Sequence, residues 1–396
     1  MGRRKLVGFA ILAQLLLASL GAAHAYAQVK TEVPPVVAGA KPDTVEHIKI
    51  HGAALEGNLE GDAVDRDVIV FLPPSYAKDK HRRYPVVYAL HGYSIGAEQW
   101  THEITVPQTI EGAFAQGAKE MIVVLPDSKT IHNGSMYSSS VTTGDYEKFI
   151  SHDVVAYIDA HYRTIPDRMS RGLVGHSMGG YGASRIGMKH PEVFGSLYIM
   201  SPCCMSARIG GGGGGRPGAG APGAPGAAAA PGAPGAARPA GGGPGMMGPS
   251  ALEQAVTAAK TPEDIAKLPA QFQTQLATAA AWAPDPKNPP LYADLPTKDG
   301  VPQPDIQAKM AANAPLAFVD QYVGNLKQYT ALSMDVGDQD GLRFDAIKLH
   351  EILDSYGIVN GFEIYHGTHT SAVADRFQNH VMPFFSKNLC ATLNCK

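Results

Sequence analysis

Residues 172–182 read Gly172-Leu-Val-Gly-His-Ser-Met-Gly-Gly-Tyr-Gly182, and their centre, residues 175–179, fits the pattern G-x-S-x-G. An apolar, strand-like run leads into this pattern, and a helix-like stretch follows it. The pattern predicts a nucleophile elbow, a tight turn between a strand and a helix with Ser177 at its tip. Because the backbone folds back on itself there, small residues must flank the serine, and Gly175 and Gly179 supply them. A helix that begins beside Ser177 would also stabilise an oxyanion through its first N–H groups.

Short apolar runs alternate with helix-like stretches along most of the chain. The predicted strands are Val45–Ile50, Arg66–Leu72, Pro85–Leu90, Met121–Leu125, Gly172–Gly175, Ser196–Ser201, Tyr329–Val336 and Gly361–Tyr365. The predicted helices are Asp145–Tyr162, Gly179–His190, Phe344–Tyr356 and Ser371–Ser386. Continuous apolar runs indicate strands that are buried on both faces. The pattern therefore predicts an α/β fold, with a mostly parallel central sheet that is flanked by helices and preceded by an antiparallel edge.

The alternation stops between the sixth and seventh predicted strands. Residues 209–250 number 42, of which 36 are Gly, Ala or Pro, so they offer almost nothing to bury and are expected to be a disordered insertion. Residues 251–281 are alanine-rich and predicted to be helical, and a proline-rich segment follows them. We expect residues 251–328 to form a lid-like insertion over the C-terminal strand ends, where ligands bind in such sheets. The chain is thus predicted to form one α/β domain in two parts, residues 44–208 with the nucleophile and residues 329–396 with the acid and the histidine.

The first residues have the features of an export signal. Basic residues at Arg3–Lys5 precede the apolar run Leu6–Leu20 and a segment of small residues, which predicts a signal peptide over residues 1–27 and a linker over 28–43. The run is shorter than the roughly 18 to 20 apolar residues that span a bilayer. We therefore expect a secreted or periplasmic protein without stable membrane anchoring. A net charge of -3 and a pI near 6.6 argue against a nucleic-acid partner.

The four cysteines fit an oxidising compartment. Cys390 and Cys395 would close a short loop at the C-terminus and are the favoured disulfide. Cys203 and Cys204 are neighbours, and because a disulfide between neighbours strains the peptide, they are expected to be buried thiols. No C-x-x-C pair suggests a metal site.

Two later strands are each followed by residues that could activate Ser177. Acyl transfer requires a histidine that takes the serine proton and a carboxylate that orients the imidazole. Asp338 and Asp340 follow the seventh predicted strand, and His366 and His369 follow the eighth. Serine, then acid, then histidine is the chain order of an α/β-hydrolase. All these residues would meet at one edge of the sheet.

Alternatives remain within each pair. Asp340 is favoured as the acid because it lies farther round its loop, whereas Asp338 could cap the turn. His369 is favoured as the base because His366 directly abuts the strand and could pack beneath it. A zinc site on His366-x-x-His369 is a rival interpretation, although no third clustered ligand accompanies it.

The loop after the third predicted strand begins His91-Gly92-Tyr93. Gly92 would let the backbone come close to the serine, so the N–H groups of Tyr93 and Met178 are predicted to form the oxyanion hole. A glycine turn without a catalytic role is the alternative.

Three stretches stand out together: His91-Gly92-Tyr93 with Trp100, residues 135–147, and Arg171–Gly182. They resemble the putative esterase family, which includes antigen 85 acyltransferases, S-formylglutathione hydrolases and feruloyl esterases. The resemblance runs from about Val45 to Phe385, apart from the low-complexity insertion. It implies a single α/β-hydrolase domain. It also implies catalytic positions at Ser177, Asp340 and His369, and oxyanion positions at Tyr93 and Met178.

These observations predict a secreted serine carboxylesterase that needs no metal or organic cofactor. Its expected substrates are feruloyl, aryl or short acyl esters, either small molecules or groups linked to a polysaccharide. Candidate pocket residues are the aromatic side chains Trp100, Tyr137, Tyr181 and Trp282, for which core packing is the alternative role. An acyltransferase of the antigen 85 type would use the same triad. A non-catalytic surface-binding module, tethered by the Gly/Ala/Pro-rich segment, is an alternative from another class.

Overall fold

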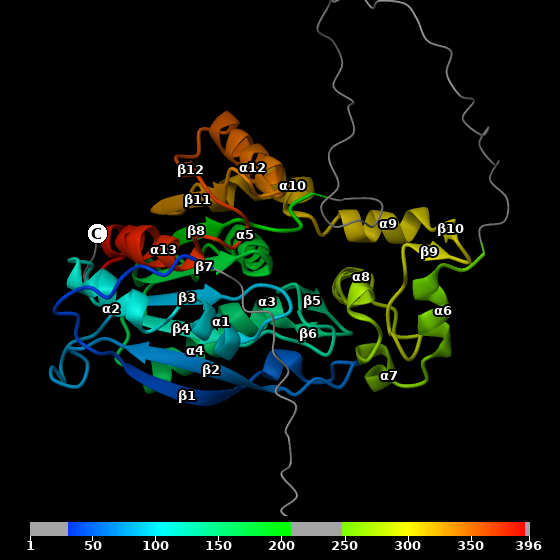
Figure 1. Cartoon of the computed structure of the whole chain (residues 1–396), viewed down its shortest axis with the longest axis horizontal. Helices are drawn as coiled ribbons and strands as arrows, with labels where there is room; N and C mark the ends of the chain where they lie inside the picture. The colour runs from blue at the N-terminus through cyan, green and yellow to red at the C-terminus, as the bar shows by residue number, and fades with distance from the viewer. Residues whose placement is uncertain (1–30, 207–247, 393–396) are drawn as a thin grey trace, which may run out of the picture.

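The computed structural model describes residues 31–206 and 248–392. Within them, eight strands form one central sheet (Figure 1). They are β1 (Thr44–His51), β2 (Asp65–Leu72), β3 (Val86–Leu90), β4 (Ile122–Pro126), β7 (Arg171–His176), β8 (Ser196–Met200), β11 (Ala331–Gly337) and β12 (Gly361–Tyr365). Each corresponds to a predicted strand. The predicted signal peptide and most of the Gly/Ala/Pro-rich insertion lie outside the described residues.

The strands are ordered β1-β2-β4-β3-β7-β8-β11-β12 across the sheet. β2 pairs antiparallel with both β1 and β4, and the six remaining strands run parallel to one another. Parallel strands place their carboxyl ends at the same edge, so the loops after β3, β7, β11 and β12 gather there. This sheet, with the G-x-S-x-G turn after β7, is the predicted α/β-hydrolase fold.

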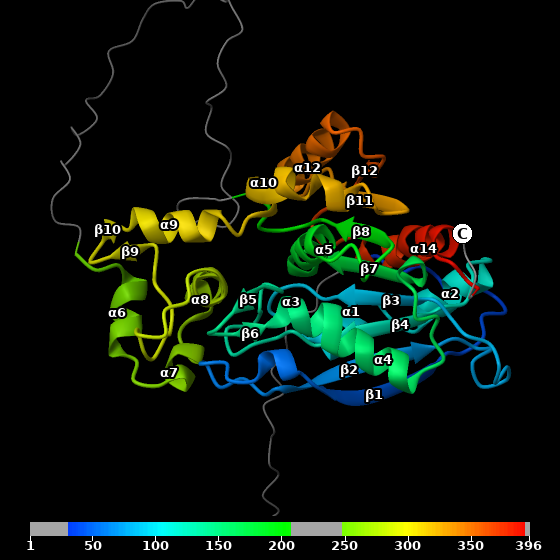
Figure 2. The same cartoon turned by 180° about the vertical axis from the view of Figure 1, so that it is seen from behind.

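Helices cover both faces of the sheet (Figures 1 and 2). One face packs against α1 (Ala97–Glu103), α2 (Gln108–Ala115), α13 (Val373–Arg376), the π-helical turn η5 (Phe377–Val381) and α14 (Met382–Asn388). The other packs against α3 (Tyr146–Lys148), the π-helical turn η2 (Phe149–Val154), α4 (Val155–His161), α5 (Met178–Lys189) and α12 (Arg343–Ser355). Successive strand residues point to opposite faces, so Val70 joins one core and Phe71 the other. Two 3₁₀ turns, η1 (Ala53–Leu55) and η3 (Arg168–Ser170), lie in the connections.

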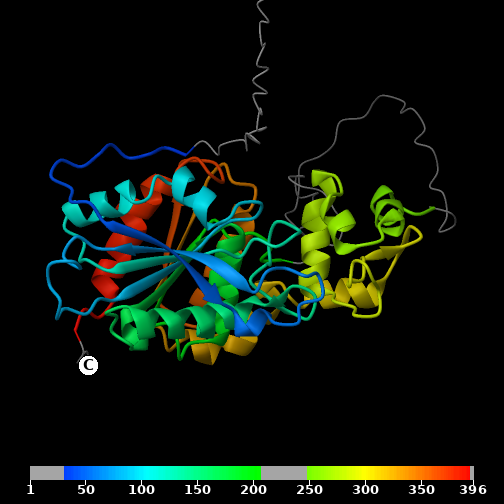
Figure 3. The same ribbon diagram turned by 90° about the horizontal axis from the view of Figure 1, so that it is seen from below.

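Residues 251–328 contain a helical group that stands to one side of the sheet (Figure 3). Its elements are α6 (Ala251–Ala258), α7 (Pro262–Ala266), α8 (Ala270–Trp282), the hairpin of β9 (Thr297–Lys298) and β10 (Val301–Pro302), and α9 (Pro304–Ala311). α10 (Pro315–Phe318), η4 (Val319–Tyr322) and α11 (Val323–Leu326) then lead back to the sheet. Leu252, Ile265 and Leu276 belong to a small core of the group's own. α8 contacts a hairpin of the main body, formed by β5 (Ser139–Ser140) and β6 (Gly144–Asp145).

The chain leaves the sheet after β8 and returns to it through α10. At the crossing point the backbone N–H of Leu316 donates to the carbonyl oxygen of Met205, at 2.9 Å. The two ends of the excursion are therefore joined side by side.

The cysteines are only partly described. Cys390 is disulfide-bonded, and Cys395, its predicted partner, lies outside the described residues. Cys203 and Cys204 are partly exposed rather than buried, and their Sγ atoms lie 2.7 Å apart. In the part of the chain that the structure describes, every helix is too short or too polar to cross a bilayer.

Candidate active site

Ser177 lies in the sharp turn between β7 and α5, with φ 59° and ψ -114°. A positive φ is strained for a residue with a side chain, and the nucleophile elbow is a turn of this kind. The flanking glycines explain how the turn closes. A Cβ atom at Gly175 would collide with the carbonyl oxygen of Gly179, and one at Gly179 would collide with that of Leu90.

Ser177, His369 and Asp340 form a hydrogen-bonded series. Nε2 of His369 lies 2.9 Å from Oγ of Ser177, and Nδ1 of His369 lies 2.7 Å from Oδ2 of Asp340. An ionised carboxylate only accepts hydrogen bonds, so Nδ1 carries the imidazole proton and Nε2 can accept one from the serine. The structure thus brings Ser177 together with the favoured member of each pair, His369 and Asp340.

The environment of Asp340 favours the ionised carboxylate. Burial alone raises the pKa of this carboxyl, whose residue is only 2% exposed. Three contributions outweigh burial and hold the pKa of Asp340 below its ordinary value. They are the hydrogen bond with His369, the charge that His369 can carry, and the hydrogen bond from the N–H of Leu342. An ionised Asp340 can stabilise a positively charged imidazole.

Asp338 and His366 form a separate pair at the surface. Nδ1 of His366 lies 3.0 Å from Oδ2 of Asp338, and the side chains are 84% and 45% exposed, so His366 does not pack beneath the strand. Asp338 also accepts the N–H of Gly367 at 3.0 Å. The two histidines therefore bond different aspartates. Among residues 31–206 and 248–392, no group of three or more His, Cys, Asp or Glu side chains is placed to hold a metal ion.

The loop after β3 passes directly beside Ser177. A Cβ atom at Gly92 would lie 3.5 Å from Cβ of Ser177. Within the described residues, the backbone N–H groups of Tyr93 and Met178 have no hydrogen-bond acceptor, and such groups can bind an oxyanion. The ring of His91 fixes the loop: Nδ1 lies 2.8 Å from the carbonyl oxygen of Gly92, and Nε2 accepts the N–H of Ser128 at 2.8 Å.

A cavity of about 110 Å³ opens beside Ser177 and His369. Its apolar wall includes Ile95, Trp100, Ile104 and Val373. Of the four aromatic pocket candidates, only Trp100 is in this wall. Tyr137, Tyr181 and Trp282 lie elsewhere, and no described residue of 251–328 lines the cavity.

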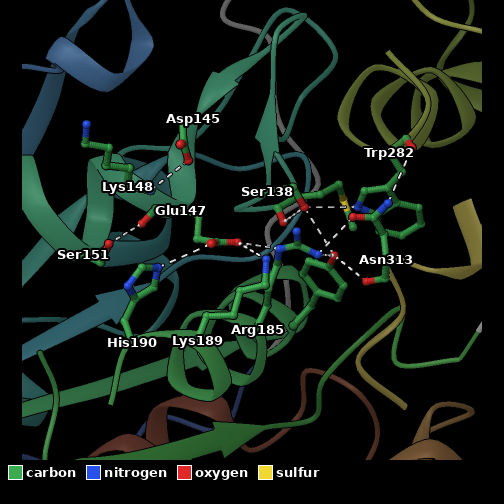
Figure 4. Close-up of polar contacts among 12 residues, drawn as sticks. Ser138, Asp145, Glu147, Lys148, Ser151, Arg185, Lys189, His190, Trp282 and Asn313 are labelled. Atoms are coloured by element: carbon green, nitrogen blue, oxygen red, sulfur yellow. Dashed lines mark hydrogen bonds and ion pairs between the residues drawn. The ribbon is translucent and has the colours of Figure 1, made fainter. Parts of the chain in front are cut away.

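Tyr181 and Trp282 belong instead to a polar cluster between α5 and the insertion. Figure 4 shows Trp282 in this cluster with Arg185 and Asn313. Arg185 of α5 lies at its centre and donates to Oε2 of Glu147 at 2.8 Å, to the Tyr181 hydroxyl at 3.2 Å and to Oδ1 of Asn313 at 3.0 Å. The Tyr181 hydroxyl donates to the carbonyl oxygen of Asn313 at 2.8 Å, and Trp282 packs against the Tyr181 ring. The helix that begins beside Ser177 is therefore tied to the insertion at its second turn.

Glu147 carries the negative charge of this cluster. Besides Arg185, its carboxylate meets Nζ of Lys189 at 3.0 Å and Nε2 of His190 at 3.4 Å (Figure 4). Burial opposes ionisation, but the hydrogen bond with His190 and the charges of Lys189 and Arg185 lower the pKa of Glu147 to about 2. The cluster is held together by charge-assisted hydrogen bonds.

Several known proteins resemble this chain in sequence or in fold. A 138-residue segment, 33% of this chain, is 30% identical to an endo-1,4-beta-xylanase/feruloyl esterase of Xylanibacter ruminicola, and the match spans only 19% of that relative. A solved ferulic acid esterase has a TM-score of 0.57 at 21% identity, covering 88% of this chain and 99% of its own. The fluorophosphonate-binding serine hydrolase F of Staphylococcus aureus has a TM-score of 0.52 at 15% identity, covering 90% and 100%. Likenesses at these identities establish a shared fold.

The sequence model of the putative esterases matches residues 63–354, which is well over half of the chain. The matched range includes Ser177, Tyr93 and Asp340. On this evidence of sequence and fold, the chain belongs to the putative esterase family.

Proposed function

We propose that this chain is a serine carboxylesterase in which Ser177 is the nucleophile, His369 the general base and acid, and Asp340 the group that orients His369. One observation carries the proposal: the series from Ser177 Oγ to His369 to Asp340, with contacts of 2.9 and 2.7 Å, at the edge of a cavity. A serine hydroxyl is a weak nucleophile, and this arrangement is what activates it.

In the acylation step, Oγ of Ser177 attacks the ester carbonyl carbon while its proton passes to Nε2 of His369. Asp340 stays ionised and stabilises the imidazolium. The tetrahedral intermediate then collapses, the bond to the alcohol oxygen breaks, and the alcohol leaves with the proton from Nε2. Water repeats the sequence on the acyl-enzyme and releases the carboxylic acid and the free serine.

The negative charge of the intermediate falls on the former carbonyl oxygen. The N–H groups of Tyr93 and Met178 are proposed to bind it, supported by their place beside Ser177 and by their lack of other acceptors in the described part of the chain. In other enzymes, removal of one such donor costs about 10²- to 10³-fold in kcat.

The size of the cavity bears on the acyl group. A cavity of about 150 Å³ in another protein holds benzene, and the cavity beside Ser177 measures about 110 Å³. This space can enclose a short acyl group, such as acetyl, whereas a feruloyl group would extend beyond it through the open side. Small-molecule esters and esters carried on a polysaccharide would both present such a group at the open side.

Hydrolysis of p-nitrophenyl acetate tests the proposal. We expect the purified protein to release p-nitrophenol and to react with a fluorophosphonate probe, and Ser177→Ala to lose both properties. Full activity in Ser177→Ala would refute the assignment. A folded wild-type protein that neither turns over esters nor reacts with the probe would favour the surface-binding module.

The same triad can hand the acyl group to an alcohol or a sugar rather than to water. Product analysis with and without an acceptor alcohol separates the two outcomes, since transfer yields a new ester and hydrolysis yields only the acid. Export is also part of the proposal. N-terminal sequencing of protein from the periplasm or the medium is expected to show that the segment 1–27 has been removed.

A further inference from the structure

His176 occupies the first variable position of the G-x-S-x-G pattern and is the last residue of β7. It is 6% exposed and is not part of the proposed triad. Its Nε2 lies 2.8 Å from the backbone carbonyl oxygen of His369. A carbonyl oxygen can only accept a hydrogen bond, so Nε2 carries a proton and donates it.

The two imidazole rings also touch. Their centroids lie 4.9 Å apart with the planes tilted by 37°. His176 therefore contacts His369 twice, through the backbone carbonyl and through the face of the ring. Both contacts come from the strand that carries the nucleophile.

His176 can make these contacts without adding charge to the site. Burial, and then the positive charge that His369 can carry, lower the pKa of His176 to about 3. At neutral pH the ring is uncharged and its single N–H is directed at His369. When His369 takes up the serine proton, no second positive ring opposes it.

Further hydrogen bonds hold this loop at residues next to His369. The N–H of Gly367 donates to Asp338, and the N–H of Thr368 donates to Oγ of Ser371 at 2.8 Å. They fix the approach to His369 but do not connect it to β7. The hydrogen bond from His176 makes that connection.

We propose that His176 is a positioning residue, whose Nε2–H holds the backbone of His369 so that the imidazole stays within hydrogen-bond reach of Ser177. This inference rests on the proposed esterase function. Because a displacement of about 1 Å can cost about 10²-fold in rate, loss of the contact is expected to lower kcat. His176 also lines the cavity, but its Nε2–H is taken up by the carbonyl oxygen of His369, so loss of this hydrogen bond should act on kcat and change KM little.

A matched pair of variants isolates the hydrogen bond. Glutamine and methionine have similar lengths and shapes, but only glutamine can present an N–H at the place of Nε2. We expect His176→Gln to keep kcat for p-nitrophenyl acetate within about fivefold of wild type, and His176→Met to lose about 10- to 100-fold with KM within about threefold. Thermal unfolding checks that the variants fold, and His176→Phe, which keeps a ring without a donor, replaces the methionine variant if that one does not.

Equal kcat values for the donor and non-donor variants would overturn the inference, as would a loss confined to KM. Ser177→Ala is measured in parallel. If it abolishes turnover while the His176 variants match wild type, the esterase proposal stands and the positioning role fails. If Ser177→Ala remains active, the proposed function itself fails.

Discussion

Asp340→Asn tests which of two neighbouring carboxylates orients His369. Asp338→Asn is the matched control, because Asp338 lies only two residues away in the chain. Oδ2 of Asp340 meets Nδ1 of His369 at 2.7 Å. If the asparagine NH₂ group faces Nδ1, the imidazole must carry its proton on Nε2 and can no longer accept one from the serine. If the amide oxygen faces Nδ1, the tautomer is kept but the negative charge is lost.

The equivalent change in known triads costs about 10⁴-fold in kcat, which corresponds to about 5 kcal/mol of transition-state stabilisation. Asp338→Asn alters only an exposed contact with Nδ1 of His366, which lies outside the hydrogen-bonded series of Ser177, His369 and Asp340. Its amide oxygen can still accept the N–H of Gly367. We therefore expect Asp338→Asn to stay within about fivefold of wild type.

The assay is kcat/KM for p-nitrophenyl acetate, with thermal unfolding curves for both variants. A difference of about 10³-fold or more between them is expected. Equal losses, or a larger loss in Asp338→Asn, would refute the assignment of the acid.

Three further outcomes follow from the site and its supports. His366→Ala should keep kcat/KM within about fivefold of wild type, whereas His369→Ala should lose at least about 10³-fold; similar losses in the same ester assay would contradict the choice of base. The pKa of Glu147 is lowered from 4.5 to about 2, so its contribution to stability is complete above 4.5 and is lost as the pH falls towards 2. Glu147→Gln should therefore lower the free energy of unfolding by about 3 kcal/mol at neutral pH and make that free energy fall less steeply in acid. Denaturant titrations at several pH values measure both effects. A variant with the same pH profile as wild type would contradict this role of Glu147. Gly179→Ala should destabilise the fold because its Cβ would overlap the backbone of β3, whereas a Cβ at Gly324 meets nothing within 4 Å. Gly324→Ala is the control for that variant in thermal unfolding, and equal midpoints would count against the packing argument.

The strands were predictable because most lie in continuous apolar runs, and all five residues of β8 are buried. α1 and α2 were not predicted, since helices of seven and eight residues show too few turns for a clear period. The alanine-rich stretch at the start of the insertion was expected to be helical, and the structure divides it into α6, α7 and α8. Two prolines, Pro262 and Pro269, mark the divisions, because proline does not continue a helix.

The chain order of serine, acid and histidine was readable from the sequence. The choice within each pair depended on which side chains turn inward. Asp340 is only 2% exposed, whereas Asp338 lies at the surface, and two residues of the same type give no sign of this difference in the sequence. Orientation also separates Trp100, in the cavity wall, from Tyr181, which faces the insertion. The contact of His176 joins residues 193 positions apart, so its only sequence signal was its place beside Ser177.

The hydrogen bond between Met205 and Leu316 has a consequence for how such a chain can evolve. Two points that are held side by side set no requirement on the number of residues between them. Residues between these points could therefore be inserted or deleted in evolution while the strands that lead to Ser177 and Asp340 keep their register.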